Sequence, residues 1–265
     1  MLGGSNRHRT SVLVLFAVLA LAVGACSSST GTPTLSASAS PTDAPTDTSG
    51  PAASADNSGS GVYGAAANIA NVPNYKFKMT LAGGSFSSLL AMFGDPGSDN
   101  AAFTVTGTVV TSPDPGSDVT IASHHVIEIG GFDYLDMGDG SYTKAAVSGS
   151  GLVSGVLPQA LYASAINASA ADGYSLAGTE DKNGVPADHY QASAAYLAEY
   201  GSILGVANAT WSADVWIAKT GGYPVGVSIL AKAADGSMAY ELSFDLTKVG
   251  DPANSVTAPT NVAGA

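Results

Sequence analysis

Tyr75-Lys76-Phe77-Lys78-Met79-Thr80-Leu81 alternates strictly between apolar and polar side chains. Successive side chains of a β-strand point to opposite faces of the sheet, so this alternation predicts a strand with one buried and one solvated face. Tyr75, Phe77, Met79 and Leu81 are expected to lie on the buried face. The stretch is therefore predicted to belong to a sheet that covers a hydrophobic core on one side.

The same period of two recurs along the chain. Phe103, Val105, Gly107 and Val109 alternate with threonines, which predicts a second strand of this kind. A single strand face is predicted to carry Ile121, Ser123, His125, Ile127 and Ile129. Further strands are predicted at 132–137, 174–179, 185–191, 210–219, 225–232 and 238–246. The Asn183-Gly184 pair favours positive φ and predicts a hairpin turn. About nine strands joined by short turns indicate a large antiparallel sheet.

Four stretches interrupt this alternation and are predicted to be helical, at 62–72, 85–93, 152–166 and 194–204. The second begins with serine and is followed by Gly94, both suitable helix-capping residues. The third contains Pro158. The second and third are apolar on nearly all sides, so other parts of the protein must cover them. Two arrangements satisfy this requirement: packing on a curved sheet, or flanking a cavity that an apolar ligand fills. The residues alone leave both open.

The first 26 residues have the layout of an export signal. Arg7 and Arg9 precede an apolar run, 12–23, which is too short for a spanning helix of roughly 20 residues. Small residues follow and end at Cys26, the only cysteine of the chain. The segment resembles a bacterial lipoprotein signal, which implies that Cys26 receives a diacylglyceryl group and becomes the mature N-terminus. An ordinary secretory signal with a chance cysteine is the alternative.

The segment 26–60 is predicted to be a solvated tether. Apart from Cys26 and Leu35 it consists of Ser, Thr, Ala, Pro, Gly, Asp and Asn, which bury too little apolar surface to offset the entropy of ordering. As a flexible chain it would span roughly 30–35 Å. The remainder, 61–265, has a suitable length for one large domain. The predicted organisation is thus a signal at 1–25, a tether at 26–60 and a folded domain at 61–265.

Charge argues against a nucleic-acid partner. The full chain has a net charge of −12, and removal of the signal takes away its only two arginines. The mature chain then has seven lysines against 21 acidic residues, a net charge of −14. Nucleic-acid binding requires clustered positive charge, and phosphate recognition often uses bidentate guanidinium groups. A strongly acidic domain would also be repelled by anionic lipids, so the acyl anchor must hold it at the membrane.

Three stretches carry a resemblance to a known family. They are 129–144 (Ile-Gly-Gly-Phe-Asp-Tyr-Leu followed by Gly-Ser-Tyr-Thr-Lys), 178–190 around Gly184-Val185-Pro186, and 213–225 with Asp214-Val215-Trp216 and Gly222-Tyr223-Pro224. In element order, lipobox and spacer the chain resembles the LppX/LprAFG lipoproteins, whose fold is similar to that of the lipoprotein carrier LolA. The resemblance implies an α+β fold. The implied structure is a strongly curved, antiparallel half-barrel of about nine to eleven strands, with a few helices on its concave face, that would hold acyl chains.

The residues offer little support for a metal site or for catalysis. His124 and His125 are adjacent, so in a strand they point to opposite faces and cannot bind one metal together. His189 stands alone, and the spacing of Asp133, Asp136 and Asp139 does not match a calcium-binding loop. No Gly-x-Ser-x-Gly nucleophile motif is present. We therefore expect no enzyme activity, no metal and no cofactor.

The expected function is binding and carriage of a lipid, glycolipid or lipoglycan across the cell envelope by a monomer anchored in the membrane. The resemblance favours a cavity over a solid core. Its walls are predicted to include Phe77, Met79, Leu89, Phe93, Val105, Ile127, Val156, Leu161, Val215 and Ile217. A membrane transporter is a partner that this function would allow. The alternative is a structural or interaction lipoprotein with a solid core, acting as an accessory to a membrane complex.

Overall fold

The computed structural model describes residues 60–83, 86, 102–136, 138–148, 151, 153–167, 170–206 and 208–263. The chain divides into two compact units, 1–50 and 51–265, and all of the described residues belong to the second. The predicted signal, Cys26 and nearly all of the tether lie outside the described residues. So do the predicted helix at 85–93, apart from Phe86, and with it Leu89 and Phe93.

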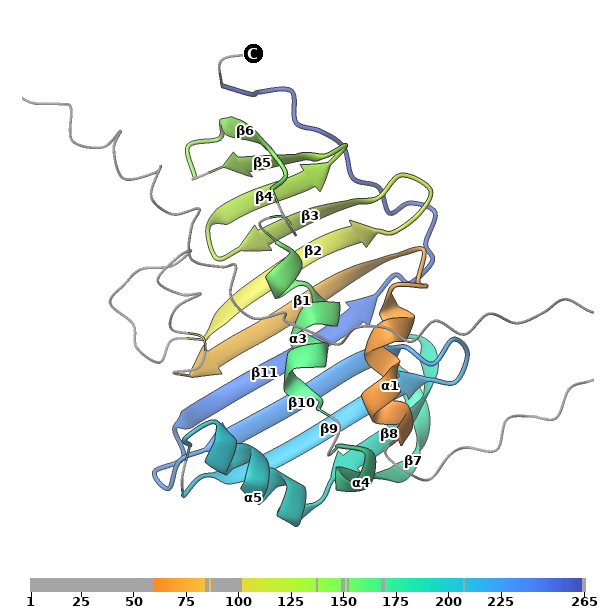
Figure 1. Ribbon diagram of the computed structural model, residues 1–265, viewed down its shortest axis with the longest axis vertical. Coiled ribbons are helices and arrows are strands. Elements are labelled where there is room, and N and C mark those ends of the chain that lie inside the picture. The colour runs from red at the N-terminus through yellow and green to blue at the C-terminus, as the bar shows by residue number, and fades with distance from the viewer. Residues whose placement is uncertain are drawn as a thin grey trace, which may run out of the picture. The chain divides into compact units, whose positions relative to one another are not determined.

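The described residues contain one open sheet of eleven antiparallel strands (Figure 1). The first group consists of β1 (Asn74–Gly83), β2 (Phe103–Val110), β3 (Gly116–Ile121), β4 (His124–Ile129), β5 (Phe132–Asp136) and β6 (Tyr142–Ala146). The second consists of β7 (Tyr174–Lys182), β8 (Val185–Ala192), β9 (Thr210–Ala218), β10 (Pro224–Lys232) and β11 (Met238–Thr247). The prediction of a large antiparallel sheet with a few helices is confirmed.

Each group is a meander, and the two groups meet where the first strand of the chain pairs with the last. The strand order is β6-β5-β4-β3-β2-β1-β11-β10-β9-β8-β7, so β1 pairs with β11 in the middle of the sheet. The edges are β6 and β7, which are consecutive in the sequence. The connection between them must therefore cross the whole sheet, ten strand spacings of about 4.8 Å each. This connection carries most of the helices.

The helices cover one face of the sheet (Figure 1). They are α1 (Ser60–Ile69), the 3₁₀-helix η3 (Ser154–Val156), α3 (Pro158–Ala165), α4 (Ala170–Gly173) and α5 (Ala194–Ile203). Helix α1 buries Val62, Ala65 and Ile69, which recur at the spacing of one helix face. Helix α5 begins at Ser193, whose hydroxyl accepts a hydrogen bond from the Tyr196 N–H at 3.3 Å.

The predicted helix at 152–166 is divided in two by Pro158. Leu157 adopts an extended conformation, with φ −73° and ψ 151°, between η3 and α3. The proline ring clashes with the helical conformation of the residue before it, while its fixed φ suits the first position of a helix. One continuous helix was therefore a wrong prediction, and Pro158 begins α3 rather than interrupting it.

The strand predicted from Ile121 to Ile129 is instead a hairpin. β3 ends at Ile121, β4 begins at His124, and those two residues pair across a two-residue turn in which Ala122 has φ 53°. Because of this turn, the odd-numbered residues of β3 share a face of the sheet with the even-numbered residues of β4. Ile121 faces the helices together with Val126, whereas Ile127 faces the other side. Ala122-Ser123 is not a sequence typical of such turns, which is why alternation alone predicted a single strand.

The core lies between the helices and the face of the sheet that carries the apolar side chains of β1. One row of paired residues crosses the sheet through Val215, Val227, Phe244, Met79, Val105 and Ile121. The ring of Tyr162 on α3 meets Phe244 edge-on, with centroids 6.3 Å apart. The hydroxyl of Tyr162 also donates a hydrogen bond to the Val62 carbonyl of α1. Helices α1 and α3 are thus linked to each other and rest together on this row.

A second, smaller cluster lies on the opposite face, under the C-terminal segment 248–263. Ile127, Tyr134 and Tyr142 are buried there, with Val256 and Val262 packed against them. Val262 also pairs in parallel with Tyr142 of the edge strand β6. The Tyr142 N–H donates to the Asn261 carbonyl at 3.0 Å, and the Ala263 N–H donates to the Tyr142 carbonyl at 2.8 Å. The C-terminal segment therefore covers this cluster and part of one sheet edge.

Removal of residues 256–265 is expected to lower the free energy of unfolding by about 2–3 kcal/mol. The truncation takes Val256 and Val262 away from the cluster around Ile127 and exposes apolar surface, at about 25 cal/mol per Å². It also leaves part of β6 unpaired, which favours association between copies through this edge. Urea unfolding measures the first effect, and size-exclusion chromatography measures the second.

The double substitution Val256→Ala and Val262→Ala separates these two contributions. It removes the same side-chain contacts but keeps the backbone pairing with Tyr142. We expect reduced stability without association. A truncated chain as stable as the full chain would show that the C-terminal segment contributes no net packing energy.

Candidate functional site

Seven of the predicted cavity walls lie together between the helices and the sheet. Phe77, Met79, Val105, Val156, Leu161, Val215 and Ile217 belong to one buried cluster. Val215 is 0% exposed and Met79 is 1% exposed. Sequence alternation thus placed the five strand residues of this set on one common face. Ile127 is the exception, because the hairpin at Ala122-Ser123 directs it to the cluster on the opposite face.

The pockets described in the structure are not lined by any of these residues. Phe77, Met79, Val105 and Val215 instead pack against protein side chains in the core. Gly107 shows how close this packing is, since a Cβ atom there would lie 2.8 Å from the Phe77 ring. These four residues belong to a packed part of the core, and the described pocket lies beside it.

A pocket of about 460 Å³ lies at the end of the same sheet face. Volumes of roughly 300–1,000 Å³ are typical of small-molecule sites. Its floor is a row of paired residues, Tyr75, Val109, Ser117 and Glu128, contributed by β1, β2, β3 and β4. The remaining lining residues are Ile69, Ala70, Val110, Thr111, Pro115, Gly116, Ile129, Gly130, Gly131, Ser154, Leu157 and Gln159.

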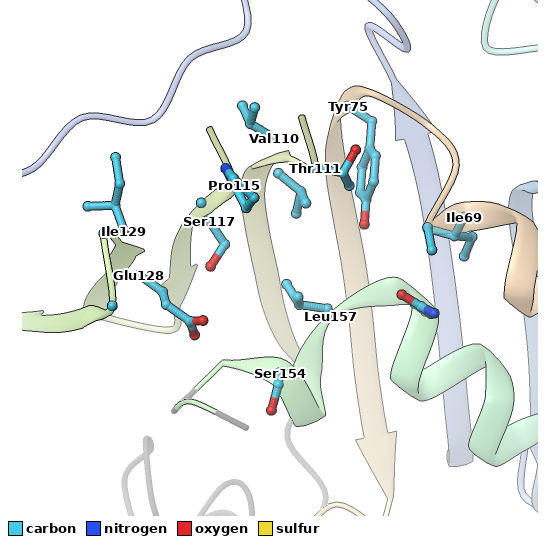
Figure 2. Close-up of a pocket in the computed structure, with 16 residues that line it drawn as sticks. Ile69, Tyr75, Val110, Thr111, Pro115, Ser117, Glu128, Ile129, Ser154 and Leu157 are labelled. Atoms are coloured by element: carbon cyan, nitrogen blue, oxygen red, sulfur yellow. The ribbon is translucent and has the colours of Figure 1, made fainter. Parts of the chain in front are cut away.

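Helix α1 and the crossover segment around η3 both approach this floor (Figure 2). Ile69 comes from the end of α1, Ser154 from η3, and Leu157 from the bend between η3 and α3. In Figure 2, Leu157, Ser117 and the carboxylate of Glu128 are directed into the space between the strands and η3. The bend at Pro158 therefore decides which side chain of the crossover reaches the pocket.

The polar groups of the lining are mostly able both to donate and to accept hydrogen bonds. Tyr75, Thr111, Ser117 and Ser154 carry hydroxyls. The Thr111 hydroxyl already donates to the Val72 carbonyl at 2.5 Å. Burial raises the pKa of the Tyr75 phenol, which therefore stays neutral at physiological pH. These groups place a few polar contacts in an otherwise largely apolar space.

Among the described lining residues, Glu128 is the one with an ionisable carboxyl. Burial raises its pKa, and the negative charge of Asp133 raises it further. Asp133 lies directly opposite on β5 and is itself buried. The crossover passes close over the Glu128 carboxylate, since a Cβ atom at Gly151 would overlap its Oε2. The lack of a side chain and the φ of +79° at Gly151 allow this approach.

Two further polar clusters lie on the outer face of the sheet. His125 Nε2 lies 2.7 Å from Asp118 Oδ1, and its Nδ1 lies 2.5 Å from the Tyr142 hydroxyl. His189 Nε2 lies 2.8 Å from Asp214 Oδ1, and its ring stacks on Trp216 with centroids 4.6 Å apart. These contacts could not be predicted from the sequence, because each of them joins residues of different strands.

Neither cluster has the composition of a metal site. Within the described part of the chain, no group of three or more His, Cys, Asp or Glu side chains is placed to hold a metal ion.

Trp211 and Trp216 lie an odd number of positions apart on β9, so they face opposite sides of the sheet. Trp211 packs on Tyr200 and Tyr240 beside the core, whereas Trp216 covers the outer face. Both act as packing residues in this structure.

No family model and no curated protein matches the chain. Among solved structures it is similar to the lipoprotein LppX of Mycobacterium tuberculosis, with 14% identity and a TM-score of 0.41, over 74% of this chain and 96% of that one. It is also similar to LprF of Mycobacterium bovis, with 12% identity and a TM-score of 0.43, over 76% and 96%. The fold resembles that of LppX and LprF.

A LolA superfamily protein of Nitrosomonas europaea is a more distant match, with 7% identity and a TM-score of 0.25 over 76% of this chain and 95% of that one. The family that the sequence motifs indicated is thus also found among the similar structures. At these values the likeness concerns the arrangement of strands and helices alone. It carries no argument about a ligand.

None of the helices in the described ranges combines the length and apolar character needed to cross a membrane.

Proposed function

We propose that this protein is a membrane-anchored lipoprotein of the extracytoplasmic face that binds the acyl chains of a lipid, glycolipid or lipoglycan and carries it across the cell envelope. In this proposal Cys26 carries the anchor and residues 26–60 form the tether. The folded domain shields acyl chains from water and performs no chemistry. The supporting observation is the pocket of about 460 Å³ between the sheet and the η3–α3 bend, which opens beside a continuous apolar core.

The energetic requirement for such a carrier is burial of hydrocarbon. Each methylene removed from water contributes about 0.8 kcal/mol, so ten methylenes contribute about 8 kcal/mol. Apolar side chains next to the pocket, such as Leu157, Val109 and Ile69, supply matching surface. Helix α3 rests on the strands through contacts such as that of Tyr162 with Phe244. An acyl chain can replace apolar contacts of this kind, provided that the hydrogen bond from the Tyr162 hydroxyl to the Val62 carbonyl is kept.

A second function has its own supporting observation. Phe77, Met79, Val105 and Val215, which were predicted to line a cavity, are packed in a filled core. A solid core fits a structural or interaction lipoprotein that serves as an accessory to a membrane complex. Native mass spectrometry of the protein purified from cells distinguishes the two. A co-purifying lipid mass supports the carrier, whereas a lipid-free mass with a stable protein partner supports the accessory.

Leu157→Trp is expected to reduce lipid occupancy at least fivefold while leaving the fold intact. Leu157 is only partly buried and lines the pocket from an extended backbone position, so a larger side chain there fills the space without entering the core. Occupancy is measured by native mass spectrometry after incubation with mixed micelles of a diacyl lipid.

Ile203→Trp provides the matched control. Ile203 is 66% exposed on α5 and lies outside the pocket, so the same aromatic group is added at the surface. Thermal unfolding confirms that both variants fold. Full lipid occupancy in Leu157→Trp would exclude this pocket as the acyl-chain site.

A further inference from the structure

The floor of the pocket contains a negative charge without a basic counterpart among the residues that line it. Glu128 extends from β4 into the pocket beside Ser117 of β3, and Ser154 of η3 lies below both in the view of Figure 2. The sixteen lining residues of the described structure include no lysine, arginine or histidine. A ligand that enters this space therefore meets one carboxyl and several hydroxyls.

The described residues of the neighbouring strands do not supply a compensating cation to this face. Asp133, directly opposite Glu128 on β5, is also acidic. Lys144 on β6 pairs with Tyr134 and lies on the other face of the sheet, where its ammonium is 3.8 Å from the centroid of the Phe132 ring. From the helix side, the backbone at Gly151 approaches the carboxyl, and the Ser154 hydroxyl donates to the Gly151 carbonyl at 3.3 Å.

The position of Glu128 also limits how water can screen its charge. The crossover backbone at Gly151 packs against the carboxylate, and the floor around it is formed by paired strands. Interactions between charges are much stronger in such a partly desolvated site than in bulk water. A phosphate or carboxylate of a ligand placed here would face like charge at short range.

We infer that Glu128 determines head-group specificity by excluding lipids with an anionic head group from this pocket. This inference rests on the proposed lipid-binding function and adds to it the charge class of the ligand. An uncharged head group can use the carboxyl as a hydrogen-bond acceptor and the Tyr75, Ser117 and Ser154 hydroxyls as partners of either kind. An anionic head group can still accept hydrogen bonds from these hydroxyls, but the Glu128 carboxylate repels its charge, which is discrimination by a repulsive element.

The effect is expected to depend on pH in a defined direction. Burial and the Asp133 charge raise the pKa of Glu128, so its carboxyl takes up a proton at a higher pH than a solvated glutamate does. The titratable group that faces it from β5 is Asp133, and His124 of β4 and Tyr75 of β1 lie on the same face of the sheet. The Gly151 backbone and Ser154, on the helix side, and Ser117, on β3, do not titrate. Mild acid should therefore neutralise the repulsion and admit anionic lipid.

A competition experiment tests this inference. The full chain, purified in a non-ionic detergent, is incubated with mixed micelles that contain equal amounts of dioleoylglycerol and dioleoylphosphatidylglycerol, which share their acyl chains. Native mass spectrometry gives the ratio of the two bound lipids at pH 8 and pH 5. We expect the wild-type protein to favour the neutral lipid by at least about tenfold at pH 8 and clearly less at pH 5.

Glu128→Gln keeps the shape of the side chain and removes its charge, and we expect it to bring the ratio at pH 8 close to one. Glu199→Gln is the control, since Glu199 is exposed on α5 and outside the pocket. An equal ratio in the wild type, or a ratio that Glu128→Gln leaves unchanged, overturns the inference while lipid binding itself stands. If neither lipid binds to the wild-type protein, the proposed function is overturned instead.

Should Glu128→Gln fail to fold, the pH series of the wild-type protein still decides. A preference for neutral lipid that is the same at pH 5 and pH 8 would assign the discrimination to groups other than Glu128.

Discussion

Cys26→Ser is expected to release the protein completely from the membrane fraction. Cys26 is the only cysteine, and it follows an apolar run that is too short to span a bilayer. A serine hydroxyl cannot form the thioether that holds the diacylglyceryl group. The mature chain has a net charge of −14, so its surface offers no compensating attraction to anionic lipid. Membrane attachment should therefore depend on the anchor alone.

Two measurements check this prediction. Fractionation of cells should move the variant from the membrane pellet to the soluble or secreted fraction, and incorporation of radiolabelled palmitate should fall to background. Ser27→Ala changes the adjacent residue and keeps the thiol, so it should remain membrane-bound and labelled. Unchanged labelling of Cys26→Ser would mean that the cysteine is not the acylated residue.

Phe244→Ala is expected to lower the free energy of unfolding by about 3–5 kcal/mol, the cost of emptying a fully packed aromatic site. Phe244 lies on β11 in the middle of the sheet, 2% exposed, between Met79 and Val227 and against the Tyr162 ring of α3. Truncation leaves a cavity where β11, its two neighbouring strands and the helix layer meet. For a domain of about 200 residues this corresponds to a fall of about 10 °C in Tm.

Ser243→Ala is the matched control for this prediction. Ser243 is the preceding residue of the same strand and faces the other side of the sheet, where its hydroxyl bonds to Glu241 at 3.1 Å. A change within about 0.5 kcal/mol is expected there. Both variants are compared by urea unfolding of the full chain. Equal losses at the two positions would contradict the assignment of the core to the helix-covered face.

Much of the sheet could be predicted because alternation is a local property. Each half-buried strand repeats its apolar residues with a period of two, so stretches such as 75–81 and 238–246 are recognisable without their partners. The Asn183-Gly184 turn is local in the same sense, and both residues have positive φ, 58° and 82°. The alternation gave a wrong prediction at Ala122-Ser123, because the sequence of this turn is atypical. Ile127 was consequently assigned to the wrong face of the sheet.

The candidate pocket could not be predicted in this way, because its residues come from segments that pairing and crossover bring together. Glu128 looks like any polar residue of an alternating strand in the sequence. It becomes a pocket residue only because β4 lies beside β3 and the chain at Gly151 passes over it. Leu157 reaches the same space because Pro158 separates η3 from α3. The predicted walls were drawn from the most apolar positions, and those are the positions that a folded chain packs most completely.

The sequence by itself determined most of the strands, the helical stretches of α1 and α5, the antiparallel class of the sheet and the side of most strands that is buried, since all of these follow from periods of a few residues. The tertiary structure alone decided that β1 pairs with β11, that the crossover spans one face, and that the C-terminal segment covers Tyr142 of β6. It also decided which part of the apolar face is filled and which remains open beside Glu128. These features depend on contacts between residues far apart in the chain, where the free energy of packing, not local propensity, selects the arrangement.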